Sequence, residues 1–538
     1  MQIDQNERDI EFEIVRYRDY MLRKYKGILK SRPPIVSVVG HIDHGKTSLL
    51  DKICSTEISS KEIGGITQKI NAYYFQINDD QKKSSITFLD TPGHSAFYKM
   101  RLRGINITDI VLLVIAMDDG IMSQTIESIQ YAKSFKIPII VAVNKIDIKK
   151  NYDKDIENHI LQYGVQSERL GGENQFIYVS AKTGEGVHEL LDAILIQSEM
   201  MELKALQNCP AKGIVIESHL DNRRGPIANI IVKEGTLRKG DVILCGFEYG
   251  RVKDIRDLNG KNVEDAFPSL PVQILGLSDV PLAGDDLIVL QDEKKAKDFA
   301  LLRKNKFREI KLDNQKKCFE KENEGAFLKG DEKIISLNII LKTDTQGILD
   351  TIQNSLEERN RSLRLKKTHS QVKIVEKGVG RINNNDIILA ITSKSIIFGF
   401  NVQIDHSSKN LLKKKFVDIR NHSIIYELLK EIDMEMNKIE RKSFNDKIQI
   451  GKLYVKNIFK SSKDRGVIVG CMVSSGKIRK DSIISIFRDK KVIFRNIQID
   501  SLKRFQNNVL EVREGVECGI KIKSFVNLQI GDKIIVFE

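Results

Sequence analysis

Hydrophobic positions alternate between two periods over residues 33–200. Short apolar runs that are typical of buried strands occur at 35–39, 73–77, 85–89, 110–116, 138–143 and 176–179. Segments with helical spacing of apolar residues separate them. This alternation predicts a doubly wound α/β domain, whose ligand-binding loops follow the carboxyl ends of the strands.

Two other regions have the short period of β-strands. Residues 210–291 contain brief β-patterned runs separated by turns such as Asn259-Gly260, which predicts a small closed barrel. The same pattern returns in 448–538, where Gly466 to Val473 aligns with Gly225 to Val232. The chain therefore carries two barrels of one type.

The region between the barrels reads as a charged, helix-prone stretch followed by a second α/β segment. We predict strands at 334–341, 372–375, 387–391 and 396–400, and helices at 348–358 and 424–442. Residues 1–32 predict a short amphipathic helix and a linker, from the spacing of Ile10, Ile14, Tyr17 and Met21. Their basic stretch 16–32 is either an RNA contact or a solvated helix face, and we favour the face.

A glycine-rich loop directly follows the strand at 35–39. Its residues are Gly40, His41, Ile42, Asp43, His44, Gly45, Lys46 and Thr47. This is the phosphate-loop pattern G-x-x-x-x-G-K-[ST] in its strand–loop–helix context. We expect backbone N–H groups to face phosphate oxygens, Lys46 to reach the β/γ-phosphates and Thr47 to bind Mg²⁺. A chance match is the alternative, which two further motifs make improbable.

The first further motif is Asp90, Thr91, Pro92, Gly93 and His94, after the strand at 85–89. A carboxylate at a strand end can hold Mg²⁺ directly or through water, and Gly93 can donate its N–H to a γ-phosphate. The loop 62–68 contains two glycines and Thr67, as a mobile segment closing on the γ-phosphate and Mg²⁺ requires. Alone, it would be an ordinary glycine turn.

The second further motif is Asn144, Lys145, Ile146 and Asp147, after the strand at 138–143. The Asp147 carboxylate can accept from both the ring N–H and the exocyclic amine of guanine, a donor pair that adenine lacks. Ser180, Ala181 and Lys182 follow another strand and support the same base. The motif set therefore predicts a GTPase that binds GTP or GDP with Mg²⁺.

Composition adds a partner class and excludes others. The 538 residues carry a net charge of +14, which favours a nucleic acid partner, although a genome rich in Lys, Ile and Asn codons would produce the same excess. The sequence has no apolar stretch near the length of a membrane span and no C-x-x-C among its six cysteines. We expect an unsecreted cytosolic protein with no membrane contact, no zinc site and no disulfide framework.

The motifs GGITQ, LDTPGH, AVNKID, ILGLS and GCMV resemble those of bacterial-type translation initiation factor 2, a translational GTPase family, over about residues 33–538. The resemblance is to a form with a short N-terminal segment. It implies a multidomain α/β and β fold with a terminal barrel that binds formylmethionyl initiator tRNA at the small ribosomal subunit. GTP hydrolysis would accompany joining of the large subunit.

The resemblance also assigns roles to residues. His94 would orient the attacking water when the ribosome pushes it inward; Thr47, Thr67 and Asp90 would hold Mg²⁺; and Asp43 would hold a monovalent cation. The tRNA contacts would be Cys471, Lys503, Arg504, Phe505, Glu517, Cys518 and Gly519. For Cys471 and Cys518 a plain core position is an equal alternative.

Both ribosomal subunits and other initiation factors are further implied partners, and we expect a monomer. We expect it in the cytoplasm of a bacterium, for which a reduced genome would explain the Lys, Ile and Asn bias, with an organelle as the alternative. An elongator-type GTPase is the first alternative function, and the second α/β segment and long helix argue against it. A non-enzymatic RNA-binding scaffold is the other, and the intact motif set argues against it.

The predicted parts are a charged helical N-terminal segment, a P-loop GTPase domain, a β-barrel, a helical linker, an α/β domain, a long connecting helix and a second β-barrel. Their predicted bounds are 1–32, 33–205, 210–292, 293–332, 333–423, 424–447 and 448–538.

Overall fold

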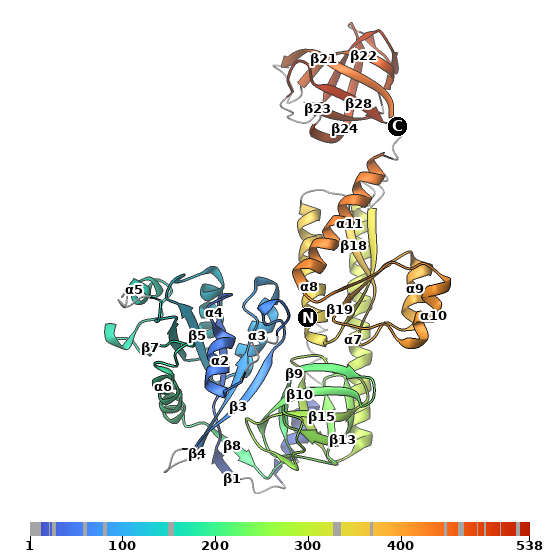
Figure 1. The fold of residues 1–538 in the computed structure, drawn as a ribbon. Helices are drawn as coiled ribbons and strands as arrows, with labels where there is room; N and C mark the ends of the chain where they lie inside the picture. The colour runs from blue at the N-terminus through green and yellow to red at the C-terminus, as the bar shows by residue number, and fades with distance from the viewer. Residues whose placement is uncertain are drawn as a thin grey trace. The chain divides into compact units, whose positions relative to one another are not determined.

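The computed structural model describes residues 12–20, 22–23, 28–56, 62–78, 83–148, 155–326, 335–365, 370–445, 449–460, 467–480, 482–488, 491–505, 507–522 and 528–537. The chain divides into two compact units, Met1–Asp433 and Met434–Glu538 (Figure 1). None of the helices within these ranges is both long and apolar enough to cross a membrane.

A six-stranded sheet forms the first part of unit 1, in the order β3-β4-β2-β5-β6-β7. Its strands are β2 (Ile35–Gly40), β3 (Asn71–Asn78), β4 (Lys83–Asp90), β5 (Ile110–Ala116), β6 (Ile139–Asn144) and β7 (Phe176–Tyr178). Only β3 runs antiparallel to its neighbour; the other strands are parallel. Each predicted strand is present.

Helices cover both faces of this sheet. They are α2 (Lys46–Cys54), α3 (Tyr98–Ile107), α4 (Ser123–Ser134), α5 (Asp155–Leu161) and α6 (Val187–Met200). Side chains of β2 alternate between two cores: Val38 packs with Leu49 of α2, whereas Val39 packs with Ile105 of α3. The predicted doubly wound arrangement is therefore confirmed.

The predicted first barrel is also present, as a closed ring in the order β10-β15-β13-β12-β16-β9. Its strands are β9 (Lys212–Asp221), β10 (Gly225–Glu234), β12 (Val242–Cys245), β13 (Glu248–Arg256), β15 (Pro271–Leu277) and β16 (Asp286–Leu290); β11 (Leu237–Arg238) pairs with β14 (Asp265–Ala266) beside the ring. The barrel contacts the sheet domain through Ser269, whose carbonyl accepts from Thr87 Oγ1 at 2.6 Å.

Residues before the sheet domain pack onto the rest of unit 1. Residues 12–20 are helical, and Ile14 is fully buried against Val242 and Leu244 of the barrel. Strand β1 (Ile28–Ser31) pairs antiparallel with β8 (Lys204–Gln207), where the sequence predicts only a linker. Ile10 and Met21 of the predicted helix lie outside the described residues.

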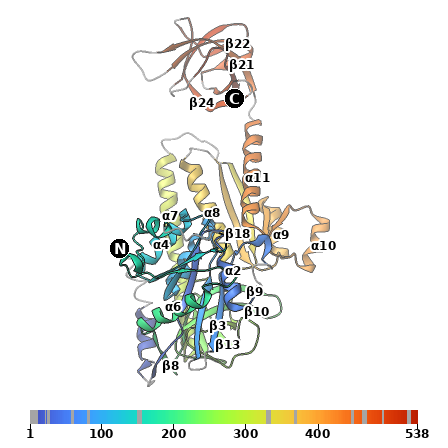
Figure 2. The same cartoon turned by 60° about the vertical axis from the view of Figure 1, so that its left-hand side comes forward.

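A four-stranded parallel sheet, ordered β18-β17-β19-β20, forms the third part of unit 1. Its strands are β17 (Ile335–Thr343), β18 (Ser370–Val379), β19 (Ile396–Phe400) and β20 (Ile419–His422); its helices are α8 (Gln346–Leu365), α9 (Asn384–Ser393), α10 (His406–Lys414) and α11 (Ile425–Asn445), and α7 (Glu293–Ala326) precedes it. Helix α8 lies beside β18 in both views (Figures 1 and 2).

The predicted strand at 387–391 is wrong, because these residues lie in α9. Asn383 and Asp386 form a reciprocal capping box that starts a helix at this point. Ile387 and Ala390 are buried while Ile388 is 54% exposed, which is the spacing of one helix face. The apolar run has the length of a strand, and only its cap shows that it is helical.

Unit 2 is a second ring of six strands, β21-β28-β23-β24-β27-β22, closed by pairing of β21 with β22. Its strands are β21 (Gln449–Lys460), β22 (Val467–Arg479), β23 (Ile483–Arg488), β24 (Lys491–Arg504), β27 (Glu517–Ile522) and β28 (Lys533–Phe537), with β25 (Asn507–Asn508) and β26 (Glu511–Arg513) added outside. The pairings repeat those of the first barrel strand for strand, so the predicted internal repeat is confirmed.

The repeat extends to backbone conformation. Gly235 and its counterpart Gly476 both have φ 76°. A Cβ at Gly235 would lie 2.6 Å from the Cys209 carbonyl oxygen, and one at Gly476 would lie 2.1 Å from that of Ile450. Both positions therefore require glycine for the same two reasons.

A buried carboxylate joins the first barrel to the third part of unit 1. Glu217 of β9 accepts at Oε1 from Gly347 N at 2.8 Å and Ser218 N at 3.1 Å. Gly347 belongs to the first turn of α8, where N–H groups lack intrahelical partners. Burial raises the pKa of Glu217 to about 7, although these hydrogen bonds oppose the shift.

This raised pKa predicts a pH-dependent stability term. Between pH 4.5 and 7 the folded protein binds more protons at Glu217 than the unfolded chain, so stability falls as pH rises through this interval. In Glu217→Gln the term is absent. We expect the variant to gain about 3 kcal/mol relative to wild type between pH 4.5 and 8, measured by urea unfolding; the exposed Glu376→Gln is the control. An identical pH dependence in all three proteins would contradict the prediction.

Candidate functional site

The phosphate loop connects β2 to α2. Gly45 is the residue before α2, has φ 81° and provides no side-chain cap. The first N–H groups of the helix therefore face outward without a side-chain acceptor, and an anion can take that place.

Two glycines let neighbouring loops approach closely. A Cβ at Gly45 would lie 2.4 Å from Asn144 Nδ2, and one at Gly93 would lie 2.6 Å from Lys46 Nζ. The predicted phosphate loop, the Gly93 loop and the Asn144 loop thus meet at contacts that exclude any larger residue.

Lys46 and Asp90 form a buried pair of opposite charge beneath this loop. Asp90 is fully buried and Lys46 is 7% exposed, and the Lys46 ammonium donates to the His41 carbonyl oxygen. Burial lowers the pKa of Lys46 to about 8 and raises that of Asp90 to about 7, while each charge favours the ionised form of the other.

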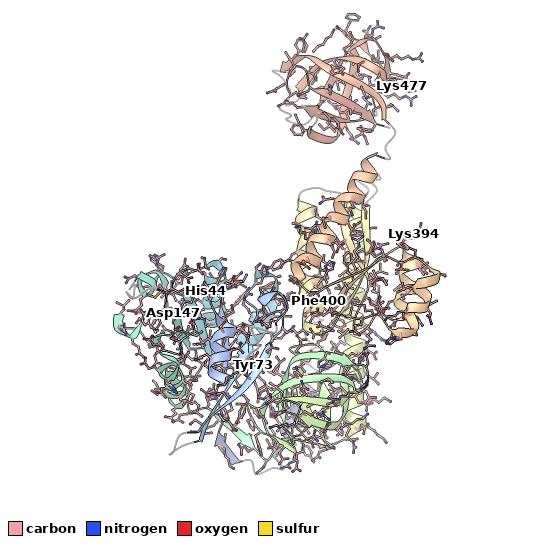
Figure 3. All side chains as sticks on the ribbon, viewed as in Figure 1. His44, Tyr73, Asp147, Lys394, Phe400 and Lys477 are labelled. Carbon is pink, nitrogen blue, oxygen red and sulfur yellow. The ribbon has the colours of Figure 1, made fainter. Side chains whose placement is uncertain are left out.

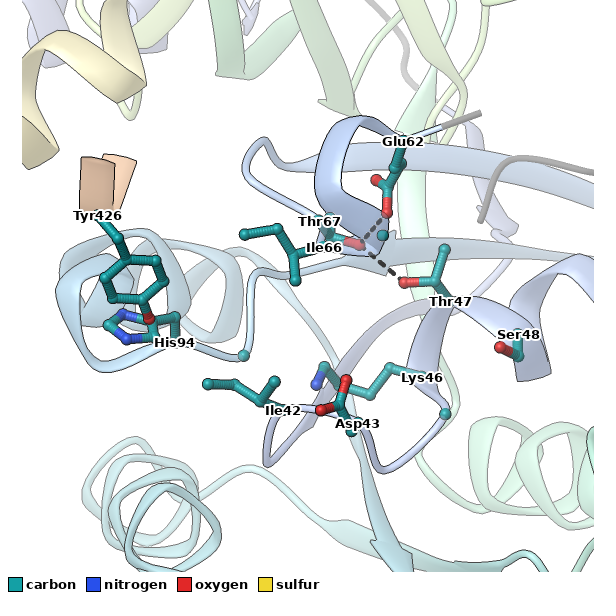
Figure 4. A pocket seen from close by; sticks show the side chains of 13 residues that line it. Ile42, Asp43, Lys46, Thr47, Ser48, Glu62, Ile66, Thr67, His94 and Tyr426 are labelled. Carbon is teal, nitrogen blue, oxygen red and sulfur yellow. Dashed lines mark hydrogen bonds between the residues drawn. The ribbon is translucent and has the colours of Figure 1, made fainter. Parts of the chain in front are cut away.

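Two threonine hydroxyls stand next to this pair. Thr47 Oγ1 lies 2.8 Å from Thr67 Oγ1, which in turn donates to Glu62 at 2.8 Å (Figure 4). Thr47 Oγ1 also donates to Asp90 Oδ2 at 3.0 Å. Asp90 Oδ1 is buried without a partner among the described residues. An oxygen-only set with an unsatisfied carboxylate oxygen fits Mg²⁺, so Thr47, Thr67 and Asp90 are suited to hold it.

The base loops meet at one amide. Asn144 Nδ2 donates to the His44 carbonyl oxygen at 3.0 Å, and Asn144 Oδ1 accepts from Ala181 N at 3.0 Å. Asp147 Oδ1 accepts from Ser180 Oγ at 2.7 Å, which fixes the carboxylate. His44 and Asp147 lie in the same region of the sheet domain (Figure 3). The phosphate loop and both base loops are therefore tied into one frame.

His94 stands at the far side of the phosphate cavity. Its Nδ1 accepts from Ala96 N at 2.9 Å, so a neutral ring carries its proton on Nε2. Burial, together with the charges of Arg101 and His41, lowers the pKa of His94 to about 4. In Figure 4, Ile42 and Ile66 lie between His94 and Lys46. A neutral imidazole is thus screened from the buried lysine by two apolar side chains.

The cavity of about 250 Å³ brings together some predicted residues and not others. Among predicted residues it is lined by Ile42, Asp43, Gly45, Lys46, Thr47, Thr67, Gly93 and His94.

Other predicted residues lie outside the cavity lining. Thr91 is buried and donates to the Val38 carbonyl oxygen, and Ile146 packs in the sheet core. Lys145 pairs with Asp118 at 3.0 Å. Gly40 ends β2, and the Pro92 carbonyl oxygen accepts from Arg101. These last residues support the loops rather than line the cavity.

The predicted tRNA contacts lie in unit 2. Phe505 is 93% exposed, with φ 53°, and the Arg504 guanidinium lies 5.9 Å from its ring. Cys471 and Cys518 face each other across β22 and β27 inside the barrel core, 2% and 4% exposed. Glu517 pairs with Lys456 at 2.6 Å, and Gly519 lies opposite Lys503 in β24. The two cysteines are therefore core side chains, and Phe505 and Arg504 are at the surface.

Comparison with known proteins connects this geometry to a family. Residues 31–199 match the Elongation factor Tu GTP binding domain, residues 210–290 Elongation factor G domain 2, and residues 311–433 Translation-initiation factor 2. A curated relative, Translation initiation factor IF-2 of Proteus vulgaris, is 49% identical over 94% of this chain. The chain belongs to the translation initiation factor 2 family. It spans 54% of the length of that relative.

Solved structures give weaker likenesses. GDP-bound aIF5B from Aeropyrum pernix has 24% identity and a TM-score of 0.43, with 94% of this chain and 92% of that chain covered. A bacterial selenocysteine-specific elongation factor EF-Sec has 23% identity and a TM-score of 0.40, with 48% and 45% covered. Likeness at this level has no bearing on function.

The structure adds residues to this initiation factor site that motifs do not mark. Arg101 of α3 is fully buried, and its guanidinium donates to the carbonyl oxygens of Pro92 and His94 and to Glu127 at 2.9 Å. Tyr426 of α11 lines the phosphate cavity. No motif marks either residue: Arg101 binds carbonyl oxygens seven and nine residues before it, and Tyr426 comes from a distant part of the chain.

The buried Arg101 predicts a large stability effect. Arg101→Met would leave Glu127 and two loop carbonyl oxygens without their donor, so we expect a loss of about 3–5 kcal/mol in unfolding free energy. Urea unfolding measures it. The matched control is Arg169→Met, since the Arg169 side chain is 69% exposed; equal, small losses in both variants would contradict the role given to Arg101.

Proposed function

We propose that this chain is a GTP-binding translation initiation factor. It promotes binding of formylmethionyl initiator tRNA to the small ribosomal subunit and hydrolyses GTP when the large subunit joins. The observation that carries the proposal is the Asn144 side chain, which ties the phosphate loop to the base loops. Family membership supports the role in initiation.

Binding of GTP follows from the charges and the hydrogen-bond donors and acceptors of the site. The N-terminus of α2 and Lys46 face the phosphates, and the Asp147 carboxylate accepts from the two guanine N–H donors. Thr47, Thr67 and Asp90 hold Mg²⁺, which neutralises phosphate charge when it is bound. Asp43 would hold a monovalent cation, a role that its position in the lining of the same cavity supports.

His94 acts by positioning water. With Nδ1 occupied by Ala96 N–H, the neutral ring offers Nε2–H as a donor, so it orients a water oxygen rather than removing its proton. Positioning is the main part of catalysis in phosphoryl transfer. Because Ile42 and Ile66 screen the ring, hydrolysis by the free protein is slow, and contact with the ribosome brings His94 inward.

The terminal barrel binds the acylated end of initiator tRNA. Lys503 and Arg504 neutralise backbone phosphates, and the exposed Phe505 ring offers an apolar contact for the methionine side chain. Other initiation factors and both ribosomal subunits are further partners. The protein acts as a monomer in the cytoplasm.

Nucleotide choice tests the first half of the proposal. Asp147→Asn replaces a charged acceptor by an amide, and hydrogen bonds to charged groups contribute about 1.5–3 kcal/mol each. We expect GTP affinity to fall at least tenfold and XTP affinity to rise, measured by competition with a fluorescent nucleotide.

The matched control for this experiment is Asp192→Asn, at an exposed position on α6. It should leave both affinities unchanged. Equal affinity of the wild type for ATP and GTP would contradict the GTP assignment.

Initiator tRNA tests the second half. In the full chain, Lys503→Ala combined with Arg504→Ala should weaken binding of initiator tRNA and reduce its salt dependence, because two phosphate contacts are lost. Fluorescence titration of formylated, unformylated and deacylated tRNA should rank the formylated form tightest in the wild type.

Lys480→Ala, an exposed lysine of the same barrel, is the control and should bind as the wild type does. Cys518→Leu is a poor probe, since it would overpack the barrel core. Equal affinity for all three tRNA forms would mean that the barrel reads RNA charge alone.

A further inference from the structure

The first turn of α11 meets the phosphate cavity through one aromatic contact. The rings of Tyr426 and His94 lie 4.1 Å apart between centroids and are nearly perpendicular, at 81°. Figure 4 shows them together at one end of the cavity. Tyr426 is 40% exposed, so its ring covers the imidazole from the surface and is not part of a hydrophobic core.

A glutamine holds this turn in place. Gln68 Nε2 donates to the Ser423 carbonyl oxygen at 2.9 Å, and Gln68 Oε1 accepts from Ile425 N at 3.2 Å. Ile425 is the first residue of α11, whose N–H has no partner within the helix. The amide of Gln68, which is 8% exposed, therefore caps α11 with both of its polar atoms.

Gln68 directly follows Thr67, the hydroxyl placed to hold Mg²⁺. Two further contacts join the segment 64–69 to the third part of unit 1. Lys69 pairs with Asp344 at 2.6 Å, and a Cβ at Gly64 would lie 3.1 Å from Ile424 Cδ1. The segment that carries Thr67 is thus also the one on which the start of α11 rests.

We infer that Tyr426 is a positioning residue for His94 and that Gln68 sets where Tyr426 stands. While Gln68 caps α11, the Tyr426 ring holds the imidazole at the α11 end of the cavity, beyond Ile42 and Ile66. Movement of Thr67 carries Gln68 with it, which shifts the first turn of α11 and releases His94. This inference rests on the proposed GTPase activity and names two residues that regulate its site.

The titration of His94 reports the contact without any nucleotide. Burial is the largest cause of its pKa of about 4, and the charges that face it are those of Arg101 and His41. Tyr426→Ala should let the pKa rise toward 6.5, followed by NMR of ¹³C-labelled histidine and assigned with His94→Gln. Tyr426→Phe keeps the ring and should keep the low pKa.

Rates of GTP hydrolysis test whether releasing His94 speeds the reaction. In single-turnover assays without ribosomes, Tyr426→Ala and Gln68→Ala should each hydrolyse GTP several-fold faster than the wild type. Combining Tyr426→Ala with His94→Ala should remove the gain, because the gain acts through His94. Glu427→Ala, exposed in the same helical turn, is the control.

Two outcomes would overturn the inference. One is an unchanged His94 titration in Tyr426→Ala, and the other is a rate gain that persists when His94 is absent. Failure of the wild type to bind GTP, or to hydrolyse it when ribosomes are present, would instead refute the proposed function, and the histidine titration would still decide whether Tyr426 holds the ring.

Discussion

The sheet domain at residues 31–199, which matches a GTP binding domain, is built around two opposite charges that are buried away from water. Lys46 and Asp90 are both buried, and burial acts against the charged form of each. Their mutual attraction offsets only part of that penalty, and Asp90 Oδ1 has no partner among the described residues. In the proposed function, phosphate oxygens and a cation supply the charges that this buried pair lacks, and the sheet holds Lys46 and Asp90 in place to receive them.

The order of the strands and loops around this pair explains why the site lies at the carboxyl edge of the sheet. Strands β4, β2 and β6 run parallel, with β5 between β2 and β6, so Asp90, Gly40 and Asn144 open three loops at the same edge of the sheet. Asn144 then joins the phosphate loop to the loop that carries Ala181, by hydrogen bonds to the backbone of His44 and Ala181. The parallel sheet fixes the loops, and a single amide fixes their spacing.

Sequence alone predicted the loops and both barrels, since the phosphate loop, the Asn144 motif and the repeated glycines are each local patterns. It missed tertiary contacts that no motif marks: Arg101 on the carbonyl oxygen of His94, Gln68 on α11 and Glu217 on α8. No periodicity or spacing marks such partners. The strand predicted at 387–391 failed for a different and local reason, because a capping box at Asn383 and Asp386 outweighs an apolar run whose length suits either structure. The tRNA contacts remain predictions; of these, only the burial of Cys471 and Cys518 shows which alternative their side chains favour.

The two barrels share every ring pairing and the left-handed glycines Gly235 and Gly476. Such agreement is the mark of an ancient internal duplication. Each copy has its own core, and neither core includes side chains of the other barrel. Exposed residues of the second copy, Phe505 among them, can therefore change without altering its core, whereas Ser269 of the first copy is held by its hydrogen bond with Thr87 of the sheet domain.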